Sequence, residues 1–310
     1  MWRMNYCGTP AVYLVALIGY GANKRRVFTA ACSATALFPA YVSIESSLQR
    51  VCTIRNAQLL QAELDETGLS FFRLSIHGRI EYLTIGRNIF STTEMAFGPS
   101  LRSLLPEFPP GDWNDGLIVK DKSTGKPYFA RAVRNTFPSV KNQWHEYSVD
   151  YSDIKVGKRL QTGIYEAQCP GFDTVVVAKF ARFHWEIRYM ESETTAYEWI
   201  KDHDIGPRFL GHLVEDGRVI GFLMERISNA RHAVLDDLEA CWDTLSRLHA
   251  LGIRHGDTSR FNFLMTDSRA VLIDYDTAQK CDDYNVLCEE LDGLAESLAS
   301  TSNRGEGGLL

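Results

Sequence analysis

The residues best suited to chemistry lie between positions 255 and 276, in the stretch HGDTSRFNFLMTDSRAVLIDYD. Asp257 and Asp274 stand 17 positions apart, and Asn262 follows the first of them by five. Carboxylate and amide oxygens are hard ligands that suit Mg²⁺, and a carboxylate can also accept a proton during catalysis. The simpler alternative is that Asp257 is a turn residue and that Asp274 is the solvated end of a strand. The elements that flank these residues help to decide between the two.

Short apolar segments predict the strands around this loop. Residues 263–265 and 271–273 should form a hairpin that links Asn262 to Asp274. Further upstream, residues 163–169 and 174–180 predict two strands joined by a tight turn. Lys179 lies at the end of the second of these strands. A lysine there is either a solvated strand end or a placed cation.

Helical periodicity appears twice between these strands and the acidic loop. Residues 186–206 predict a helix closed by Gly206, and residues 235–253 predict an amphipathic helix with acidic residues in its first turn. The apolar segment 218–227 between them predicts a buried strand. One face of the first helix carries Glu193, Ala196, Tyr197 and Ile200. The apolar stripe of the second carries Leu238, Cys241, Trp242, Leu245 and Leu248.

This order of elements resembles the protein-kinase-like superfamily. Lys179 in VVVAKF matches the lysine of the kinase V-A-I-K strand, HGDTSRFN matches H-x-D-x-x-x-x-N, and IDYD stands where D-F-G would be. Glu193 is the best match for the helix partner of the lysine. Glu191 is the runner-up, because the sequence does not fix the register of the helix. The resemblance covers about residues 150–295.

The resemblance implies ATP and Mg²⁺ as cofactors and gives each polar residue a role. Lys179 would contact the α- and β-phosphates, and Glu193 would hold it there. Asp274 and Asn262 would be the metal ligands, supplied from two loops joined by the hairpin. Asp257 would orient the acceptor hydroxyl and take its proton.

The resemblance also implies where the base of the nucleotide lies. The segment LMERI looks like the kinase hinge, with Met224 at the gatekeeper position and the backbone of Glu225 and Ile227 facing adenine. Residues 156–167 stand where the nucleotide-covering loop would be, with Gly163 as its contact to the cofactor. This loop is poor in glycine for a kinase, since it holds one other glycine besides Gly163.

Four features bear on the branch of the superfamily. Gly256 replaces the Arg usual in regulated protein kinases, so HGD is more like aminoglycoside phosphotransferases and choline kinases. Ser259 stands where these families usually place Lys or His to touch the transferred phosphate, and Arg260 is the available substitute. Phrases such as IGPRFLGH and LHALGIRHGD are most similar to fungal kinase-like proteins. Only 36 residues follow Asp274, which implies a trimmed C-terminal lobe.

The expected fold is therefore α+β. A protein-kinase-like two-lobed domain with a trimmed C-terminal lobe should occupy residues 150–298, followed by a disordered tail over 299–310. An N-terminal region of unknown role, residues 1–149, should be partly β.

Two hairpins are predicted within this N-terminal region. Residues 70–86 should turn at His77-Gly78, and residues 119–133 at Ser123-Thr124-Gly125. Residues 105–116 are rich in turn formers and could hold a domain boundary or a surface loop.

Composition places broad limits on the function. The 310 residues are 45% hydrophobic and 23% charged, which is ordinary for a globular protein, and the net charge of −6 gives no sign of nucleic-acid binding. Seven cysteines without a C-x-x-C motif favour reduced thiols and a cytoplasmic location. The apolar run 11–22 is too short to span a bilayer, so no stable membrane insertion is expected. It could be a buried strand, a leader, or a weak signal peptide that would allow secretion.

These observations favour an atypical ATP-dependent kinase that moves a γ-phosphoryl group to a hydroxyl of a small molecule or a protein. The alternative is a pseudokinase that binds a nucleotide or a protein partner without turnover. A third hypothesis, a metal-dependent hydrolase built on acidic residues, lacks clusters of histidine ligands. The sequence does not identify the phosphate acceptor.

Overall fold

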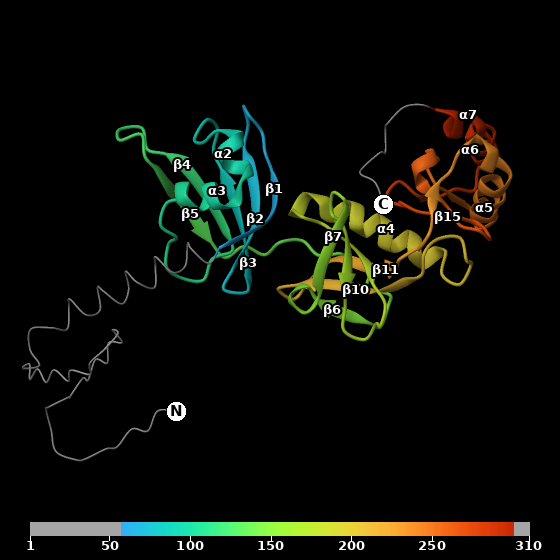
Figure 1. Ribbon diagram of the computed structural model, residues 1–310, viewed down its shortest axis with the longest axis horizontal. Coiled ribbons are helices and arrows are strands. Elements are labelled where there is room, and N and C mark those ends of the chain that lie inside the picture. Colours follow the sequence, from blue (N-terminus) through green and yellow to red (C-terminus); the bar gives the residue numbers. More distant parts are fainter. Residues whose placement is uncertain (1–56, 301–310) are drawn as a thin grey trace, which may run out of the picture.

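The computed structural model describes residues 57–300, which form a mixed α+β structure with several sheets (Figure 1). The apolar run 11–22 lies outside the described residues, as does the tail from residue 301 on. Among residues 57–300, no helix has the length and apolar character needed to cross a bilayer.

The first sheet contains five strands in the order β1-β2-β3-β4-β5. Their bounds are β1 Gln58–Glu63, β2 Ser70–Ile76, β3 Arg79–Ile85, β4 Asp115–Lys120 and β5 Pro127–Val133. Strands β3 and β4 are parallel, and the crossover between them carries α2 (Thr92–Ala96) and α3 (Gly98–Leu104). The other neighbours are antiparallel.

Both predicted hairpins of this region are confirmed. Strands β2 and β3 pair around His77 and Gly78, which both have positive φ as a tight turn requires. Strands β4 and β5 pair around the turn at 121–126, which the Asp121 carboxylate stabilises by accepting the backbone N–H groups of Ser123 and Thr124. Strand β4 begins within the turn-rich segment 105–116, at Asp115.

The second sheet has the order β6-β10-β11-β9-β8-β7. Its strands are β6 Ser148–Asp150, β7 Lys155–Gln161, β8 Ile164–Gln168, β9 Val176–Phe180, β10 Phe209–Glu215 and β11 Arg218–Glu225. Only the pair formed by β6 and β10 is parallel within this sheet. Helix α4 (Ile187–Trp199) follows the short 3₁₀ turn His184–Glu186 and packs against β11.

A helical part with small sheets completes the described chain. Its helices are α5 Leu238–Ala250, α6 Tyr284–Asp292 and α7 Leu294–Ala299. One small sheet has the order β12-β14-β15 (Arg231–His232, Phe263–Met265, Ala270–Leu272), and the other pairs β13 (Ile253–Arg254) with β16 (Gln279–Lys280). The predicted hairpin between Asn262 and Asp274 is the β14–β15 pair.

The apolar core is divided between the two large sheets. One buried cluster includes side chains from Ala57 to Ile118 and belongs to the first sheet. The other runs from Val140 to Leu298, so it joins the second sheet to the helical part. Residues from 140 onward therefore pack with the second sheet, although the first strand of that sheet begins only at Ser148.

Two sequence predictions about the helices were wrong. Helix α4 ends at Trp199 and not at Gly206, because Asp202 and Asp204 adopt the positive φ that short polar residues tolerate and that no α-helix contains. Trp242 is 51% exposed, while its neighbour Cys241 is fully buried. One residue corresponds to about 100° around a helix, which carries Trp242 past the edge of the apolar stripe.

Candidate functional site

A cavity of about 200 Å³ lies between the second sheet and the helical part. Apolar side chains form its walls, and four polar side chains stand together in its lining. The apolar residues are Leu160, Ile164, Val177, Met224, Ile227, Leu264 and Ile273. These four are Lys179, Glu193, Asn262 and Asp274, and the other polar residues of the lining are Gln161, Glu225, Arg226 and Asn229. An apolar cavity with a few convergent polar groups is the usual form of a small-molecule site.

Lys179 is placed by a strand that is buried along its whole length. Strand β9 lies between β8 and β11, and all five of its residues are buried. The Lys179 Nζ atom lies 2.6 Å from Oε2 of Glu193 and 2.6 Å from Oδ1 of Asp274. One ammonium group therefore joins α4 to the segment after β15.

The expected pairing of Lys179 with Glu193 is confirmed, and Glu191 faces elsewhere. Glu193 is 1% exposed and points toward the sheet. Glu191 accepts hydrogen bonds from the backbone N–H groups of Lys141 and Asn142 instead. Residues two apart on a helix point about 200° from each other, so only one of the two glutamates can face β9.

The three charges are unequally satisfied. Burial would lower the pKa of Lys179, but Glu193 and Asp274 outweigh burial and raise it, so the ammonium remains charged. Lys179 lowers the pKa of Asp274. Burial raises the pKa of Glu193 to about 7, against the attraction of Lys179. Within the described residues neither Glu193 oxygen has a hydrogen bond of good geometry. The contact of Glu193 with Lys179 is therefore an ion pair without a well-directed hydrogen bond.

The β14–β15 hairpin brings Asn262 and Asp274 together. The Ile273 N–H donates to the carbonyl oxygen of Asn262 at 2.9 Å, which fixes the two ends of the hairpin. Asp274 has φ of 66°, a left-handed conformation that is uncommon outside glycine and is often found at functional sites. The Asn262 Nδ2 atom donates to the Asp257 carbonyl at 3.0 Å. This bond leaves the amide oxygen of Asn262 as the group suited to a metal ion.

Asp257 lies in the same loop but outside the lining of the cavity. Its side chain is exposed, and its Oδ1 accepts the Ser259 N–H at 3.2 Å. Its own N–H donates to Nδ1 of His255 at 3.3 Å. A carboxylate at this position can receive a proton from a molecule that approaches from solvent.

Glu290 is a supporting residue that the sequence did not reveal. It lies on α6, and its carboxylate accepts the N–H groups of His255 at 3.0 Å and Gly256 at 2.7 Å. His249 lies 2.7 Å from the same carboxylate. Burial would raise the pKa of Glu290, but the bonds from His249 and the two backbone groups prevail and lower it. The sequence holds no signal for this contact, because it joins segments 34 positions apart through one face of a short helix.

The backbone conformation at position 256 explains why a glycine stands there. Its φ is 89°, and a Cβ atom added there would lie 2.9 Å from the Thr277 carbonyl oxygen. A larger residue would therefore be both strained and crowded. The need for glycine at this position follows from the close approach of two loops.

A series of tilted and edge-on ring contacts joins the second sheet to the acidic loop. The ring centroids of Phe209 and Tyr197 lie 5.7 Å apart, those of Tyr197 and Tyr275 5.3 Å, and those of Tyr275 and His255 5.2 Å. Tyr197 lies one helical turn after Glu193, and Tyr275 directly follows Asp274. The rings therefore fix the spacing between the residues that carry these two carboxylates.

Of the four residues expected beside the base or in the loop that covers the nucleotide, three line the cavity and one does not. Met224, Glu225 and Ile227 all line the cavity. Gly163 forms the turn between β7 and β8 with φ of 76°, and it is the neighbouring Gln161 and Ile164 that line the cavity.

The two residues near the expected phosphate position have other contacts. The Ser259 hydroxyl caps the 3₁₀ turn Arg260–Asn262 by accepting the Phe261 N–H. The Arg260 guanidinium lies over the Phe261 ring, 4.4 Å from its centroid.

The oxygen ligands beside Lys179 suit a Mg²⁺ ion that also binds phosphate and water better than they suit a metal ion held by protein side chains alone. Among residues 57–300 there is no group of three or more His, Cys, Asp or Glu side chains that could hold a metal ion. Asp274 and Asn262 offer two hard oxygen ligands. Mg²⁺ commonly binds through one or two carboxylates together with substrate phosphates and water, so the residues present fit this ion.

No known protein family matches the chain, and no curated protein shows significant similarity to it. Support for a function therefore comes from its own residues and their geometry.

Proposed function

We propose that this chain is an atypical Mg²⁺-dependent phosphotransferase with a kinase-like two-lobed arrangement of residues 150–298. It would move the γ-phosphoryl group of ATP to a hydroxyl of a small molecule or a protein. The observation that carries the proposal is the contact of Lys179 with both Glu193 and Asp274, at 2.6 Å each, in the lining of an apolar cavity.

The polar residues would bind and align the phosphates. Lys179 supplies a permanent positive charge, and Glu193 restrains it from the helix side. Mg²⁺, when bound, would neutralise phosphate charge, and Asp274 and Asn262 are the residues that would hold it. Phosphoryl transfer depends mainly on positioning and charge stabilisation, so this small set is sufficient.

The base would lie between the apolar walls, beside the backbone of Glu225 and Ile227. At about 200 Å³ the cavity is smaller than the range of about 300–1,000 Å³ common for ligand pockets. A whole nucleotide would therefore extend from it, with its phosphates toward the polar residues. The exposed Asp257 would orient the acceptor hydroxyl and take its proton.

A pseudokinase is the second candidate. The Ser259 hydroxyl caps a turn where related enzymes present a phosphate contact, and Arg260 lies against the Phe261 ring. A chain that lacks such a contact could bind a magnesium–nucleotide complex and still fail to transfer phosphate.

Two aspartate variants test the proposed roles. Asp274→Ala should abolish Mg²⁺-dependent nucleotide binding, measured by titration calorimetry. Asp257→Ala should bind nucleotide nearly as the wild type does and lose turnover, because only acceptor alignment and proton removal are affected. Asp267→Ala, in the exposed β14–β15 turn, is the matched control and should change neither property. Equal loss of binding in the first two variants would refute these roles, and wild-type binding without turnover would favour the pseudokinase.

A further inference from the structure

Helix α4 is held on its outer side by residues 134–147, the linker between the first sheet and the second. The Glu191 carboxylate accepts the backbone N–H of Lys141 through Oε2 and that of Asn142 through Oε1, the latter at 3.2 Å. The Asn142 amide in turn donates to Thr195 Oγ1 at 3.2 Å and to Glu198 Oε2 at 2.7 Å. Three side chains on one face of α4 are thus hydrogen-bonded to two residues of the linker.

Trp144 extends this attachment toward the end of the helix. Its Nε1 atom donates to the Thr194 carbonyl at 2.9 Å, and its ring packs against Phe209 with centroids 4.7 Å apart. The Lys201 ammonium lies 5.8 Å from the centroid of the Trp144 ring. The linker therefore covers α4 from its middle to its C-terminal end.

The first sheet touches the segment that leads into the same helix. Phe71 on β2 packs edge-on against Trp185, in the turn that leads into α4, with ring centroids 4.6 Å apart. Arg182, just before that turn, pairs with Glu186 and reaches Glu63 of β1 at 3.3 Å. The linker thus contacts α4 itself, and the first sheet contacts the residues directly before it.

A buried ion cluster fixes the first sheet in place. Arg73 on β2 is fully buried and pairs with Glu215 at the end of β10. It also donates to Gln61 at 2.6 Å and lies 4.2 Å from the centroid of the Tyr151 ring. Tyr82 of β3 donates to the same Glu215 at 2.5 Å. A charge pair buried in this way is costly to break, so the first sheet is firmly attached to the second.

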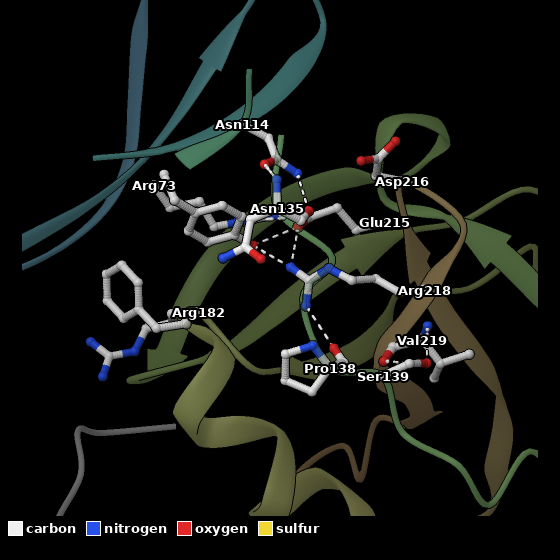
Figure 2. Close-up of polar contacts among 12 residues, drawn as sticks. Arg73, Asn114, Asn135, Pro138, Ser139, Arg182, Glu215, Asp216, Arg218 and Val219 are labelled. Carbon is white, nitrogen blue, oxygen red and sulfur yellow. Dashed lines mark hydrogen bonds and ion pairs between the residues drawn. The ribbon is translucent and has the colours of Figure 1, made fainter. Parts of the chain in front are cut away.

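Arg218 joins this cluster to the start of the linker, as Figure 2 shows. Its guanidinium donates to Glu215 at 2.7 Å, to the Tyr82 hydroxyl at 2.6 Å and to the Pro138 carbonyl at 3.2 Å. Directly beyond Pro138, the N–H of Val140 donates to the Val219 carbonyl at 2.9 Å. Hydrogen bonds therefore hold the chain at Pro138, at Val140 and at the two residues that bind Glu191.

We propose that residues 57–147 position α4 for phosphoryl transfer and that Glu191 is the positioning residue through which they act. This inference rests on the proposed function. Glu191 and Glu193 project from nearly opposite sides of the helix. The linker holds the first, and Lys179 contacts the second. The Glu193 carboxylate has no hydrogen bond of good geometry within the described residues, so Glu191 is the one of the two carboxylates that fixes α4 through hydrogen bonds.

Hydrogen exchange of full-length variants tests this. Glu191→Ala removes the acceptor of two linker N–H groups, so exchange of the α4 amides should accelerate at least tenfold while β14 keeps its protection. Arg188→Gln, on an exposed position of the same helix, is the matched control and should leave exchange unchanged. Glu191→Gln retains one acceptor oxygen and should give an intermediate rate. If α4 exchanges in Glu191→Ala as in the control, or if β14 accelerates equally, the proposal is wrong.

A kinetic measurement separates positioning from general destabilisation. In Glu191→Ala, kcat for nucleotide turnover should fall about tenfold or more, with a smaller change in KM, because the bound phosphates lose alignment. An equal kcat in Glu191→Ala and Arg188→Gln would overturn the proposed role. A wild-type protein that binds no nucleotide would refute the proposed function, whereas the exchange comparison would still decide whether the linker holds α4.

Discussion

Among residues 57–300, the charge cluster at the junction of the sheets and the one at the cavity differ in how fully their groups are bonded. In the cluster at the junction of the sheets, Glu215 accepts from Arg73, Tyr82 and Arg218. In the cluster at the cavity, Lys179 lies between two carboxylates, and one of them, Glu193, has no hydrogen bond of good geometry among residues 57–300.

This difference indicates that the Arg73 cluster attaches one sheet to the other, whereas the Lys179 cluster is suited to bind a ligand. Buried polar groups are normally satisfied, so a fully bonded cluster such as that of Arg73 needs no ligand to explain it. Its net effect on Glu215 is a lowered pKa, because Arg73 and Arg218 overcome the cost of burial. The cluster of Lys179 borders a cavity and keeps one carboxylate with a raised pKa. Perturbed groups that line a cavity are typical of functional sites.

The largest loss of stability should follow from breaking the first cluster. Arg73→Met leaves Glu215 buried without its main partner, so the free energy of unfolding should fall by about 3–5 kcal/mol. Urea denaturation measures this. The double variant Arg73→Met/Glu215→Met removes both charges and should recover part of the loss, since a well-packed apolar pair often replaces a buried ion pair at little cost. A single variant as stable as the wild type would contradict the attachment of the first sheet.

The corresponding change in the second cluster should affect turnover more than stability. Lys179→Met removes the charge that would face the phosphates, so kcat should fall by about 10²–10³-fold, the range seen when one placed charge stabiliser is lost. Its unfolding free energy should change less than that of Arg73→Met, because Glu193 can take up a proton when Lys179 is absent. The same denaturation experiment checks this. A greater loss of stability than in Arg73→Met would reverse the comparison.

A backbone change in the acidic loop should have a smaller effect. Gly256→Ala should lower the unfolding free energy by about 2–4 kcal/mol, from the cost of a left-handed alanine and from crowding against Thr277. Gly217→Ala is the matched control, because Gly217 has φ of 75° but no neighbour within 4 Å of an added Cβ atom. That control should lose only about 1–2 kcal/mol. Equal losses in urea denaturation would show that the loops are not crowded.

The smallest change in stability is expected when mild acid protonates His212, which bonds to the linker at His145. Burial, with a contribution from His145, lowers the pKa of His212 to about 4, and its Nε2 accepts the His145 N–H at 3.2 Å. An unfolded histidine titrates near about 6.5, so the unfolded chain binds a proton first. The contribution of His212 to stability should therefore be constant above that pH and fall as the pH drops from about 6.5 toward 4. His212→Gln can accept the same bond without titrating, so it should show a flatter dependence in urea denaturation. Identical pH profiles would exclude His212 as the source.

Local patterns in the sequence predicted much of the site. Alternation and turn residues predicted the hairpins at His77-Gly78 and 121–126, and helix periodicity favoured Glu193 over Glu191 without excluding Glu191. These features depend on neighbours in sequence, which is why they can be read from it. The end of α4 was missed, because the preference of Asp202 and Asp204 for turns prevailed over the apolar pattern.

Long-range contacts were not predictable in the same way. The bond of Glu290 to the loop at Gly256 joins residues 34 positions apart, and that of Arg73 to Glu215 joins residues 142 apart. Neither leaves a periodic signal, and a buried arginine on an alternating strand resembles an exposed one. The attachment of the first sheet to the second likewise joins segments far apart in the sequence.

Titration calorimetry of the full-length protein with ATP, in the presence of Mg²⁺ and in the presence of a chelator, tests the central claim most directly. If Lys179, Asp274 and Asn262 form a magnesium–nucleotide site, the protein should bind the Mg²⁺ complex and bind metal-free ATP at least about tenfold more weakly, because Asp274 then repels the phosphates. No binding under either condition, or equal binding under both, would contradict the assignment of this cavity.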